Sequence, residues 1–573
     1  MIKKITVLAF LSIVTLISCA QSDEQNYEGE WIGFLPNKSS FNFQVSLEKL
    51  NNSNYHLTIS NSKTLIDKNV TVSEENHILF NLDKQLFFNL EYDKKNKELN
   101  GYIKTGKFYY YISLEDRGNN KFAGPWNPFM LDNGLQSDDI MLYAENTEDD
   151  NLVAYPFFGD QRFRGTWTSG FKRKGNTLIF RDGNTGFNFR AKLLKNTIEL
   201  EILLTDVSIT KTSLKHTNDG WDYNRDALDQ SQNANIPTQL NDGWATASIE
   251  DYGINKNQLT RLIDSVHSNN TLVNTHSVLI AKQNKLVFEN YFDGFNGQIP
   301  HDLRSASKSI SSAIIGIAID DKIIESVDEI LYDYIPKEYQ YTKDALKSKI
   351  KIKDLLTMSS GLDVNNKAAE DNYQDPRHSK NWLKTVLEAP MVKEPGTYAD
   401  YGSANPFLLG VYLNERLEQS LEKYMHEKLF APLGITNYIN QADDTENIPY
   451  FGGGMLLTPR DLLKFGQLYL NNGLWNGQQI ISENWVKESI AKHVQLQDVQ
   501  DKNEYGYFWW HDTYTINGKS IKCIEARGAG GQFIFLIPEL ESVVVMTTGN
   551  FRNRRGNQPR DILKEYILPA LLN

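Results

Sequence analysis

Cysteine is nearly absent from this chain of 573 residues. The only two cysteines are Cys19 and Cys523. If Cys19 is covalently modified, no intrachain disulfide is possible. The best interpretation of Cys523 is then a small buried apolar residue.

Basic clusters and metal-binding motifs are also missing. Lys and Arg number 60 against 72 Asp and Glu, giving a formal net charge of −12 with no block of basic residues. This balance argues against nucleic acid as a partner. The ten histidines show no HExxH or paired spacing, so we expect neither a metal site nor a cofactor. The composition, 40% hydrophobic and 23% charged, is typical of a soluble globular protein, and the length suggests roughly three or four domains.

The N-terminus has the pattern of an export signal. Lys3 and Lys4 precede an apolar run over residues 5–17, which is too short to span a bilayer comfortably. The following Leu16-Ile17-Ser18-Cys19 and its polar continuation resemble the lipobox of bacterial lipoproteins, in which the cysteine becomes the lipidated first residue. We therefore expect residues 1–19 to be a lipoprotein signal and Cys19 to anchor the exported protein to a membrane of the bacterial cell envelope. The alternative is a plain secretory signal with an incidental cysteine.

Alternating apolar and polar residues predict antiparallel sheets over the next two hundred residues. The pattern is clear at 41–47, 55–59 and 86–92, and it returns at 187–193 and 198–204. We predict two all-β modules, lipocalin-like or sandwich-like, at residues 20–118 and 119–215.

Each predicted module contains a Gly-x-Trp sequence. These are Gly29-Glu30-Trp31 and Gly165-Thr166-Trp167, which look like the first-strand signature of lipocalin-like barrels. A tryptophan at the start of a strand is more often a core residue than a ligand contact, so we favour the core interpretation.

The second half of the chain has a different pattern. Residues 216–245 are rich in Asn, Asp, Gln and Gly and are interpreted as a linker. An amphipathic helix near 259–266, a strand pair at 278–292 and a buried helix near 305 follow; helical periodicity dominates from about 320 to 500, and strands return at 532–546. We predict one α/β domain over residues 246–573, with a sheet built from both of its ends and an inserted helical region.

The buried helix near residue 305 carries the first candidate for chemistry, Ser305-Ala306-Ser307-Lys308. A serine and a lysine three residues apart lie on one face of a helical turn, close enough to share a proton. The spacing alone means little, because it recurs at Ser46, Ser60, Ser169, Ser208, Ser348, Ser420 and Ser489. Ser305 differs in its context, since it follows a strand and begins a buried helix, where free N–H groups favour an oxyanion.

Two further segments complete the set. Tyr401-Gly402-Ser403 precedes a helical stretch; Ser403 is either a helix cap beside a packing tyrosine, or Tyr401 is a phenol beside Lys308 that moves protons to and from Ser305. The segment from Ala526 to Gln532 is rich in glycine and enters a strand. It is either a bulge or a place where a backbone N–H group supplies the second oxyanion donor.

These motifs, in this order, resemble the serine hydrolase family of class C β-lactamases, serine DD-peptidases and family VIII esterases over about residues 245–570. The resemblance implies an α/β β-lactamase/transpeptidase-like fold, with Ser305 as the nucleophile, Lys308 as its base or activator and Tyr401 as the proton shuttle. It also places Ser403 beside the substrate, and it implies an oxyanion hole formed by the N–H group of Ser305 and the Gly528-Ala529 segment.

One departure from the family concerns the third motif. The β-lactamases and DD-peptidases have Lys or His at its first position, where this chain has Ala526, and the neighbouring Arg527 should point to the other face of the strand. We therefore expect an esterase, amidase or peptidase that forms an acyl-enzyme with a small ester or amide. The alternatives are a penicillin-binding protein or β-lactamase, and a catalytically silent envelope lipoprotein that binds a ligand through its β modules.

Overall fold

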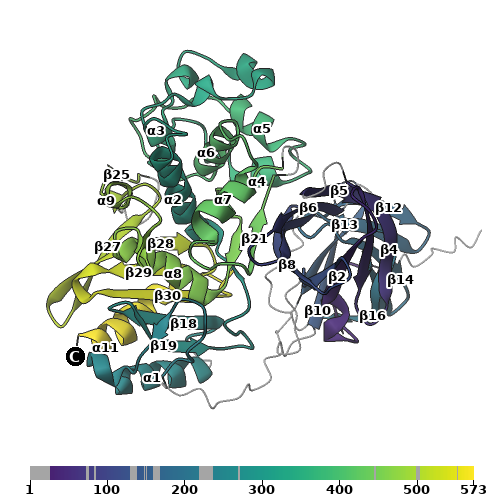
Figure 1. Cartoon of the computed structure of the whole chain (residues 1–573), viewed down its shortest axis with the longest axis horizontal. Helices are drawn as coiled ribbons and strands as arrows, with labels where there is room; N and C mark the ends of the chain where they lie inside the picture. The colour runs from purple at the N-terminus through teal and green to yellow at the C-terminus, as the bar shows by residue number, and fades with distance from the viewer. Residues whose placement is uncertain are drawn as a thin grey trace, which may run out of the picture.

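The computed structural model describes residues 26–572 apart from 73–76, 83–85, 129–138, 148, 150, 159–167, 219–235, 269–270, 444–446, 498–503 and 552. The expected signal at 1–19 with Cys19, and the second Gly-x-Trp at 165–167, lie outside the described residues. Figure 1 shows a β-rich N-terminal region in purple and blue beside a larger α/β region in teal to yellow. No helix in the described part of the chain is long and apolar enough to cross a membrane.

The N-terminal region consists of antiparallel strands, as the alternating pattern predicts. Its described strands are β1 (Gly29–Phe34), β2 (Phe43–Lys49), β3 (Asn54–Ser60), β4 (Thr64–Thr71), β5 (His77–Leu82), β6 (Leu86–Asp93), β7 (Glu98–Thr105), β8 (Phe108–Asp116), β9 (Lys121–Trp126), β10 (Asp139–Asn146), β11 (Leu152–Phe158), β12 (Thr168–Lys174), β13 (Thr177–Asp182), β14 (Asn188–Leu193), β15 (Thr197–Leu204) and β16 (Val207–Thr217). One sheet has the order β11-β10-β1-β16-β15-β14-β13-β12. The other contains β8-β9-β2-β3-β4, with β5, β6 and β7 added beside β8.

The two halves of this region share a sheet and a core. Strand β1 lies in the first expected module but pairs with β10 and β16, which lie in or end the second. One hydrophobic cluster contains buried residues of both halves, among them Trp31 and Leu214. Trp31 is 2% exposed and its Nε1 donates to the carbonyl oxygen of Tyr27 at 2.9 Å. Trp31 is therefore a core residue, and the boundary placed at residue 118 stays a prediction.

The C-terminal region is an α/β structure whose main sheet is assembled from both of its ends. Its sheet has the order β17-β19-β18-β30-β29-β28-β27-β26-β25. The strands are β17 (Ala245–Thr246), β18 (Thr275–Lys282), β19 (Lys285–Tyr291), β25 (Val494–Gln495), β26 (Glu504–Tyr505), β27 (Trp510–Ile516), β28 (Lys519–Gly528), β29 (Gln532–Ile537) and β30 (Ser542–Thr548). Early strand β18 pairs with late strand β30, so the predicted α/β fold class with an all-β N-terminal region is confirmed.

Helices cover both faces of this sheet and form the inserted region. They are α1 (Lys256–His267), α2 (Ser307–Asp320), α3 (Ile352–Leu356), α4 (Glu370–Gln374), α5 (Trp382–Glu388), α6 (Ala404–Asn414), α7 (Leu421–Met425), α8 (Pro459–Leu470), α9 (Glu483–Ser489), α10 (Gln558–Ile562) and α11 (Leu568–Leu571). Apolar residues of α1, α10 and α11 pack on one face, and those of α2 and α8 pack on the other. Cys523 is buried in the first of these layers as a free thiol, and burial raises its pKa.

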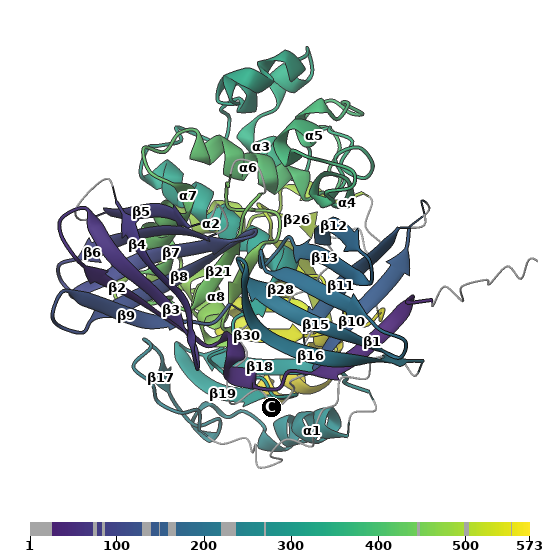
Figure 2. The ribbon, with the colours of Figure 1, turned by 90° about the vertical axis from the view of Figure 1, so that its right-hand side faces the viewer.

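The N-terminal sheet continues into the C-terminal region through three short strands. Strand β8 pairs with β21 (Tyr438–Gln441), β21 pairs with β22 (Met455–Leu457), and β22 pairs with β20 (His301–Asp302). Both views place β8 beside β21 (Figures 1 and 2). The hydroxyl groups of Tyr102 and Tyr438 also lie 2.7 Å apart across this junction. A continuous hydrogen-bonded sheet thus joins the N-terminal region to the strand that directly precedes Ser305.

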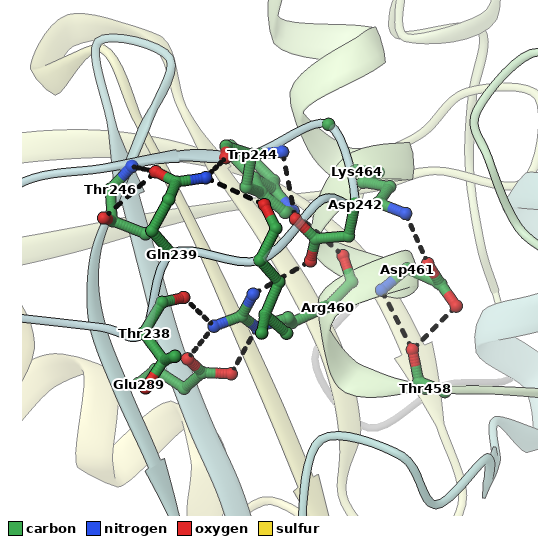
Figure 3. Close-up of polar contacts among 12 residues, drawn as sticks. Thr238, Gln239, Asp242, Trp244, Thr246, Glu289, Thr458, Arg460, Asp461 and Lys464 are labelled. Atoms are coloured by element: carbon green, nitrogen blue, oxygen red, sulfur yellow. Dashed lines mark hydrogen bonds and ion pairs between the residues drawn. The ribbon is translucent and has the colours of Figure 1, made fainter.

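The described end of the expected linker is fixed by one buried arginine, Arg460 of α8. Figure 3 shows its guanidinium between three partners: Nε and Nη2 donate to Glu289 at 2.6 and 2.5 Å, Nη1 donates to Asp242 at 2.9 Å, and Nη2 also reaches the carbonyl oxygen of Thr238 at 2.9 Å. Trp244, only 2% exposed, donates through Nε1 to the carbonyl oxygen of Arg460. Residues 236–245 therefore pack on the α/β region. A buried ion pair has no periodic apolar pattern, which is why composition alone suggested a linker.

We predict that Arg460→Met strongly destabilises the protein. The Arg460 side chain is 6% exposed and its partner Glu289 is 9% exposed, so the substitution leaves a buried carboxylate without its cation, at a cost of about 3–5 kcal/mol. The measurement is the urea midpoint followed by tryptophan fluorescence. The control is Lys487→Met, whose side chain is 63% exposed and which should change stability by less than about 0.5 kcal/mol. Equal midpoints for the two variants would contradict this account.

Candidate active site

Ser305 lies on a strained turn between β20 and α2. Residues Arg304–Ala306 form a single 3-10 turn, and Arg304 has a φ of 48°, a left-handed conformation that is uncommon for a residue with a side chain. Asp302 holds this conformation, because it accepts a hydrogen bond from the backbone N–H of Arg304 at 3.0 Å and lies 2.8 Å from its Nε. Backbone strain of this kind clusters at functional sites.

Lys308 is buried one turn further along, with 1% of its surface exposed. Its Nζ lies 2.7 Å from Ser305 Oγ and 3.1 Å from Ser403 Oγ, and it also donates to the carbonyl oxygen of Gly452. Three oxygen partners match the three N–H donors of an ammonium group. A neutral amine fits the same positions, since it would donate hydrogen bonds to Gly452 and Ser403 and accept a hydrogen bond from the hydroxyl group of Ser305. The geometry therefore suits both protonation states that a base must adopt.

Ser403 directly precedes α6 but does not act as its cap. Its side chain makes no capping hydrogen bond. The hydroxyl group instead accepts from Lys308 and lies 3.3 Å from Glu370 Oε2, to which it donates. The structure therefore argues against the cap interpretation of Ser403, and the role of Tyr401 as a proton shuttle stays a prediction.

Tyr401 lies beside the same lysine. The Nζ of Lys308 is 5.2 Å from the centroid of the Tyr401 ring. The Tyr401 ring also packs against two aromatic rings, with centroid distances of 5.4 Å to Trp510 and 6.3 Å to Tyr505. Packing between these rings restricts Tyr401 to the neighbourhood of the Ser305 and Lys308 side chains.

Gly528 brings the third motif into contact with the nucleophile turn. A Cβ atom at this position would lie 2.1 Å from the carbonyl oxygen of Leu303 and 3.2 Å from the nitrogen of Ala306. Only glycine allows this approach. The next residue, Ala529, is exposed and lines a cavity together with Arg304, so the Gly528-Ala529 backbone lies beside the turn that carries Ser305.

Arg527 is not available to a substrate carboxylate. Its guanidinium pairs with Asp512 at 3.0 Å and with Glu525 at 2.7 Å, and its side chain is 13% exposed. Arg560 of α10 binds the same Asp512, which places this network on the face of the sheet opposite α2. Ala526 is fully buried on the α2 side. The structure thus agrees with the expectation that Arg527 does not replace the family cation missing at Ala526.

Three residues of the site were missed in the sequence. Glu370 accepts hydrogen bonds from Ser403 and from the hydroxyl of Tyr450 at 2.8 Å, and Gly452 supplies a carbonyl oxygen to Lys308. Gly452 begins a run of three glycines in the sequence, and it has no room for a side chain, since a Cβ would lie 2.2 Å from Tyr450 Oη. Glu370 and Tyr450 gave no signal of periodicity or spacing. Among the described residues, no group of acidic, histidine or cysteine side chains is arranged to hold a metal.

Comparison with models of known protein families identifies the family of this chain. The family model described as Beta-lactamase matches residues 273–568, which is more than half of the chain. The chain belongs to the beta-lactamase family. The resemblance stated from the sequence is therefore confirmed, while the roles of Ser305, Lys308, Tyr401, Ser403 and the Gly528-Ala529 segment stay predictions that their proximity supports.

Individual relatives of this beta-lactamase-family chain are distant. A 6-aminohexanoate-dimer hydrolase from Paenarthrobacter ureafaciens is 24% identical over 300 residues, covering 47% of this chain and 71% of the relative. Beta-lactamase-like protein 4 from Dictyostelium discoideum is 26% identical over 261 residues, covering 38% of this chain and 45% of the relative. Among solved structures, a family VIII carboxylesterase gives a TM-score of 0.43 at 15% identity, covering 55% of this chain and 98% of that structure.

We predict that Gly528→Ala slows the reaction of Ser305 by about 100-fold, because a methyl group there displaces the nucleophile turn and small misplacements of catalytic groups have effects of this size. The measurement is the rate of covalent labelling by a fluorophosphonate probe. The control is Gly556→Ala, where a Cβ would meet only Gly530 N at 3.8 Å, an ordinary contact. If both variants label at the wild-type rate, the close approach at Gly528 has no role in the site.

Proposed function

We propose that this protein is a serine hydrolase that cleaves a small ester or amide through an acyl-enzyme at Ser305. The observation that carries the proposal is the 2.7 Å separation between Lys308 Nζ and Ser305 Oγ on a strained turn. Membership of the beta-lactamase family and a relative named as a dimer hydrolase support hydrolysis as the class of reaction.

Acylation begins with the hydroxyl group of Ser305. The neutral amine of Lys308 takes the Oγ proton while Oγ forms a bond to the carbonyl carbon of the substrate. The negative charge that develops on the carbonyl oxygen is stabilised by backbone N–H groups of Ser305 and Ala529. Ser403 and Gly452 hold the lysine in place through its other two hydrogen bonds.

Release of the leaving group needs a proton on its oxygen or nitrogen. Tyr401, next to Lys308, gives its phenolic proton to the leaving atom as the carbon–leaving-group bond breaks, and it regains a proton from the lysine. Water then attacks the acyl-enzyme, the same groups accept and return its proton, and Ser305 is restored. The net reaction is hydrolysis, with no cofactor.

A carboxylate-bearing β-lactam is a poor match for this site. Ala526 stands at the position where β-lactamases and DD-peptidases have Lys or His, and it carries no charge. Arg527 forms ion pairs with Asp512 and Glu525 on the other face of the strand. An ester or an amide without that carboxylate needs no such cation. We therefore favour esterase, amidase or peptidase activity over penicillin recognition.

Ser305→Ala should abolish labelling by a fluorophosphonate and lower ester hydrolysis by several orders of magnitude, because no other group replaces the nucleophile. The measurement is in-gel fluorescence of the purified protein, together with kcat/KM for a p-nitrophenyl ester. Undiminished labelling of the variant would falsify the assignment of Ser305.

A fluorescent penicillin in the same labelling experiment separates the alternatives. We expect no acylation of the wild type by this probe. Labelling by penicillin at Ser305 would favour a penicillin-binding protein, and failure of every probe to label the wild type would favour a catalytically silent lipoprotein.

We also propose that the protein is attached to the bacterial cell envelope through a lipid on Cys19. The support is the sequence Leu16-Ile17-Ser18-Cys19 after the apolar run of residues 5–17. Cys19→Ser should move the exported protein from the membrane fraction to the soluble fraction, measured by fractionation and immunoblotting. A variant that stays in the membrane fraction would contradict lipid attachment at this residue.

A further inference from the structure

A cavity of about 670 Å³ opens beside the proposed nucleophile. Three of its lining residues, Arg304, Ala529 and Gly530, belong to the nucleophile turn and the third motif. Glu370, which also lines it, is hydrogen-bonded to Ser403. A volume of this size holds a small organic molecule. The cavity therefore adjoins the place where the reacting carbonyl group of a substrate would meet Ser305.

The opposite wall comes from the N-terminal β region, about 150 residues earlier in the chain. Strand β10 contributes Tyr143 and Glu145, and strand β11 contributes Tyr155 and Phe157. Tyr143 and Tyr155 are paired across the two strands and their rings are stacked at 6.4 Å. Tyr143 is 37% exposed, so this wall offers aromatic surface to a ligand.

Charged groups of both regions act on the phenol of Tyr155, which lies in this wall. Burial raises the pKa of Tyr155 to about 12, with a further upward effect of Glu145 and a downward effect of Arg377. Since Arg377 belongs to the segment after α4, groups from both regions act on one phenol. The continuous pairing of β8, β21, β22 and β20 connects the two regions. The cavity is thus built jointly by both.

The charges around the cavity are unequal. Its lining contains four carboxylates, Glu145, Glu370, Asp371 and Asp375, against two guanidinium groups, Arg304 and Arg377. Both guanidinium groups have carboxylate partners, since Arg377 pairs with Asp375 at 2.5 Å and Arg304 with Asp302 at 2.8 Å. The carboxylate of Asp371 has no ion-pair or hydrogen-bond partner among the described residues. Aromatic rings next to such carboxylates attract organic cations, and an excess of negative charge around a concave site strengthens that effect.

We propose that the N-terminal β region determines the substrate selectivity of this hydrolase. Its aromatic wall receives an apolar part of the substrate, and the excess of carboxylates favours a cationic end over a neutral or anionic one. Tyr143, Tyr155 and Phe157 contact the apolar part, and Asp371 faces the charge. This inference rests on the proposed hydrolase function, because it takes the cavity beside Ser305 as the place where the substrate binds.

The test compares benzylammonium, benzyl alcohol and benzoate, which are similar in shape and differ in charge. Each is measured as a competitive inhibitor of p-nitrophenyl acetate hydrolysis by the full chain. Each is also titrated calorimetrically into Ser305→Ala, which reports binding without turnover. Benzylammonium should bind about three- to tenfold more tightly than benzoate, the size expected for one partly exposed charge interaction.

Variants on each wall separate charge from shape. Asp371→Asn should remove most of the preference for benzylammonium and leave benzyl alcohol unaffected, whereas Tyr143→Ala should weaken all three ligands by a similar factor. The matched controls are Asp264→Asn, exposed on α1, and Tyr341→Ala, 64% exposed; neither residue lines the cavity, and neither change should alter binding.

The outcomes distinguish this inference from the function on which it rests. Ester hydrolysis with equal affinity for the three ligands, or with wild-type affinities in Tyr143→Ala, would overturn the inference and leave the hydrolase intact. Selective binding of benzylammonium to Ser305→Ala, lost in the double variant with Asp371→Asn, supports the cavity as the binding site. If the wild type then hydrolyses no ester, the proposed reaction fails instead.

Discussion

The proposed active site depends on the burial of one lysine. Lys308 can remain in an environment where only 1% of its surface is exposed because three oxygen atoms surround its Nζ. A buried ammonium without such partners is costly. Those oxygens come from the nucleophile turn, from the start of α6 and from the glycine run after β21, so α2, α6 and the glycine run must all be in place before the site exists.

The same constraint explains the contribution of the N-terminal region. The nucleophile turn follows β20, which is held by β22 and β21, and β21 is paired with β8 of the N-terminal sheet. The other N-terminal sheet contributes as well, because its strands β10 and β11 form a wall of the cavity beside the site. The N-terminal region thus supports the strand before Ser305 and limits the space in front of it.

Sequence reasoning was most effective where the signal is local. The apolar spacing after Ser305 predicted a buried helix, and α2 begins at Ser307 after a short turn. The alternating residues predicted antiparallel strands, and Ala526 with Arg527 predicted a missing cation. Local patterns did not reveal that β1 joins the sheet formed by the second expected β module. They also did not reveal that Arg460 holds residues 236–245. These contacts join residues roughly a hundred to two hundred positions apart and leave no periodicity in either segment.

The sequence by itself determined the fold class, the family and the candidate trio of Ser305, Lys308 and Tyr401, since residue types at short spacings and in a fixed order specify them. Only the tertiary structure decided that Ser403 accepts a hydrogen bond from Lys308 instead of capping α6. It also showed that Gly452 contacts Lys308, that Glu370 contacts Ser403, and that two strands of the N-terminal region line the cavity. The physical reason is that hydrogen bonds and cavity walls depend on distances in space. Folding alone sets those distances between segments remote in the chain.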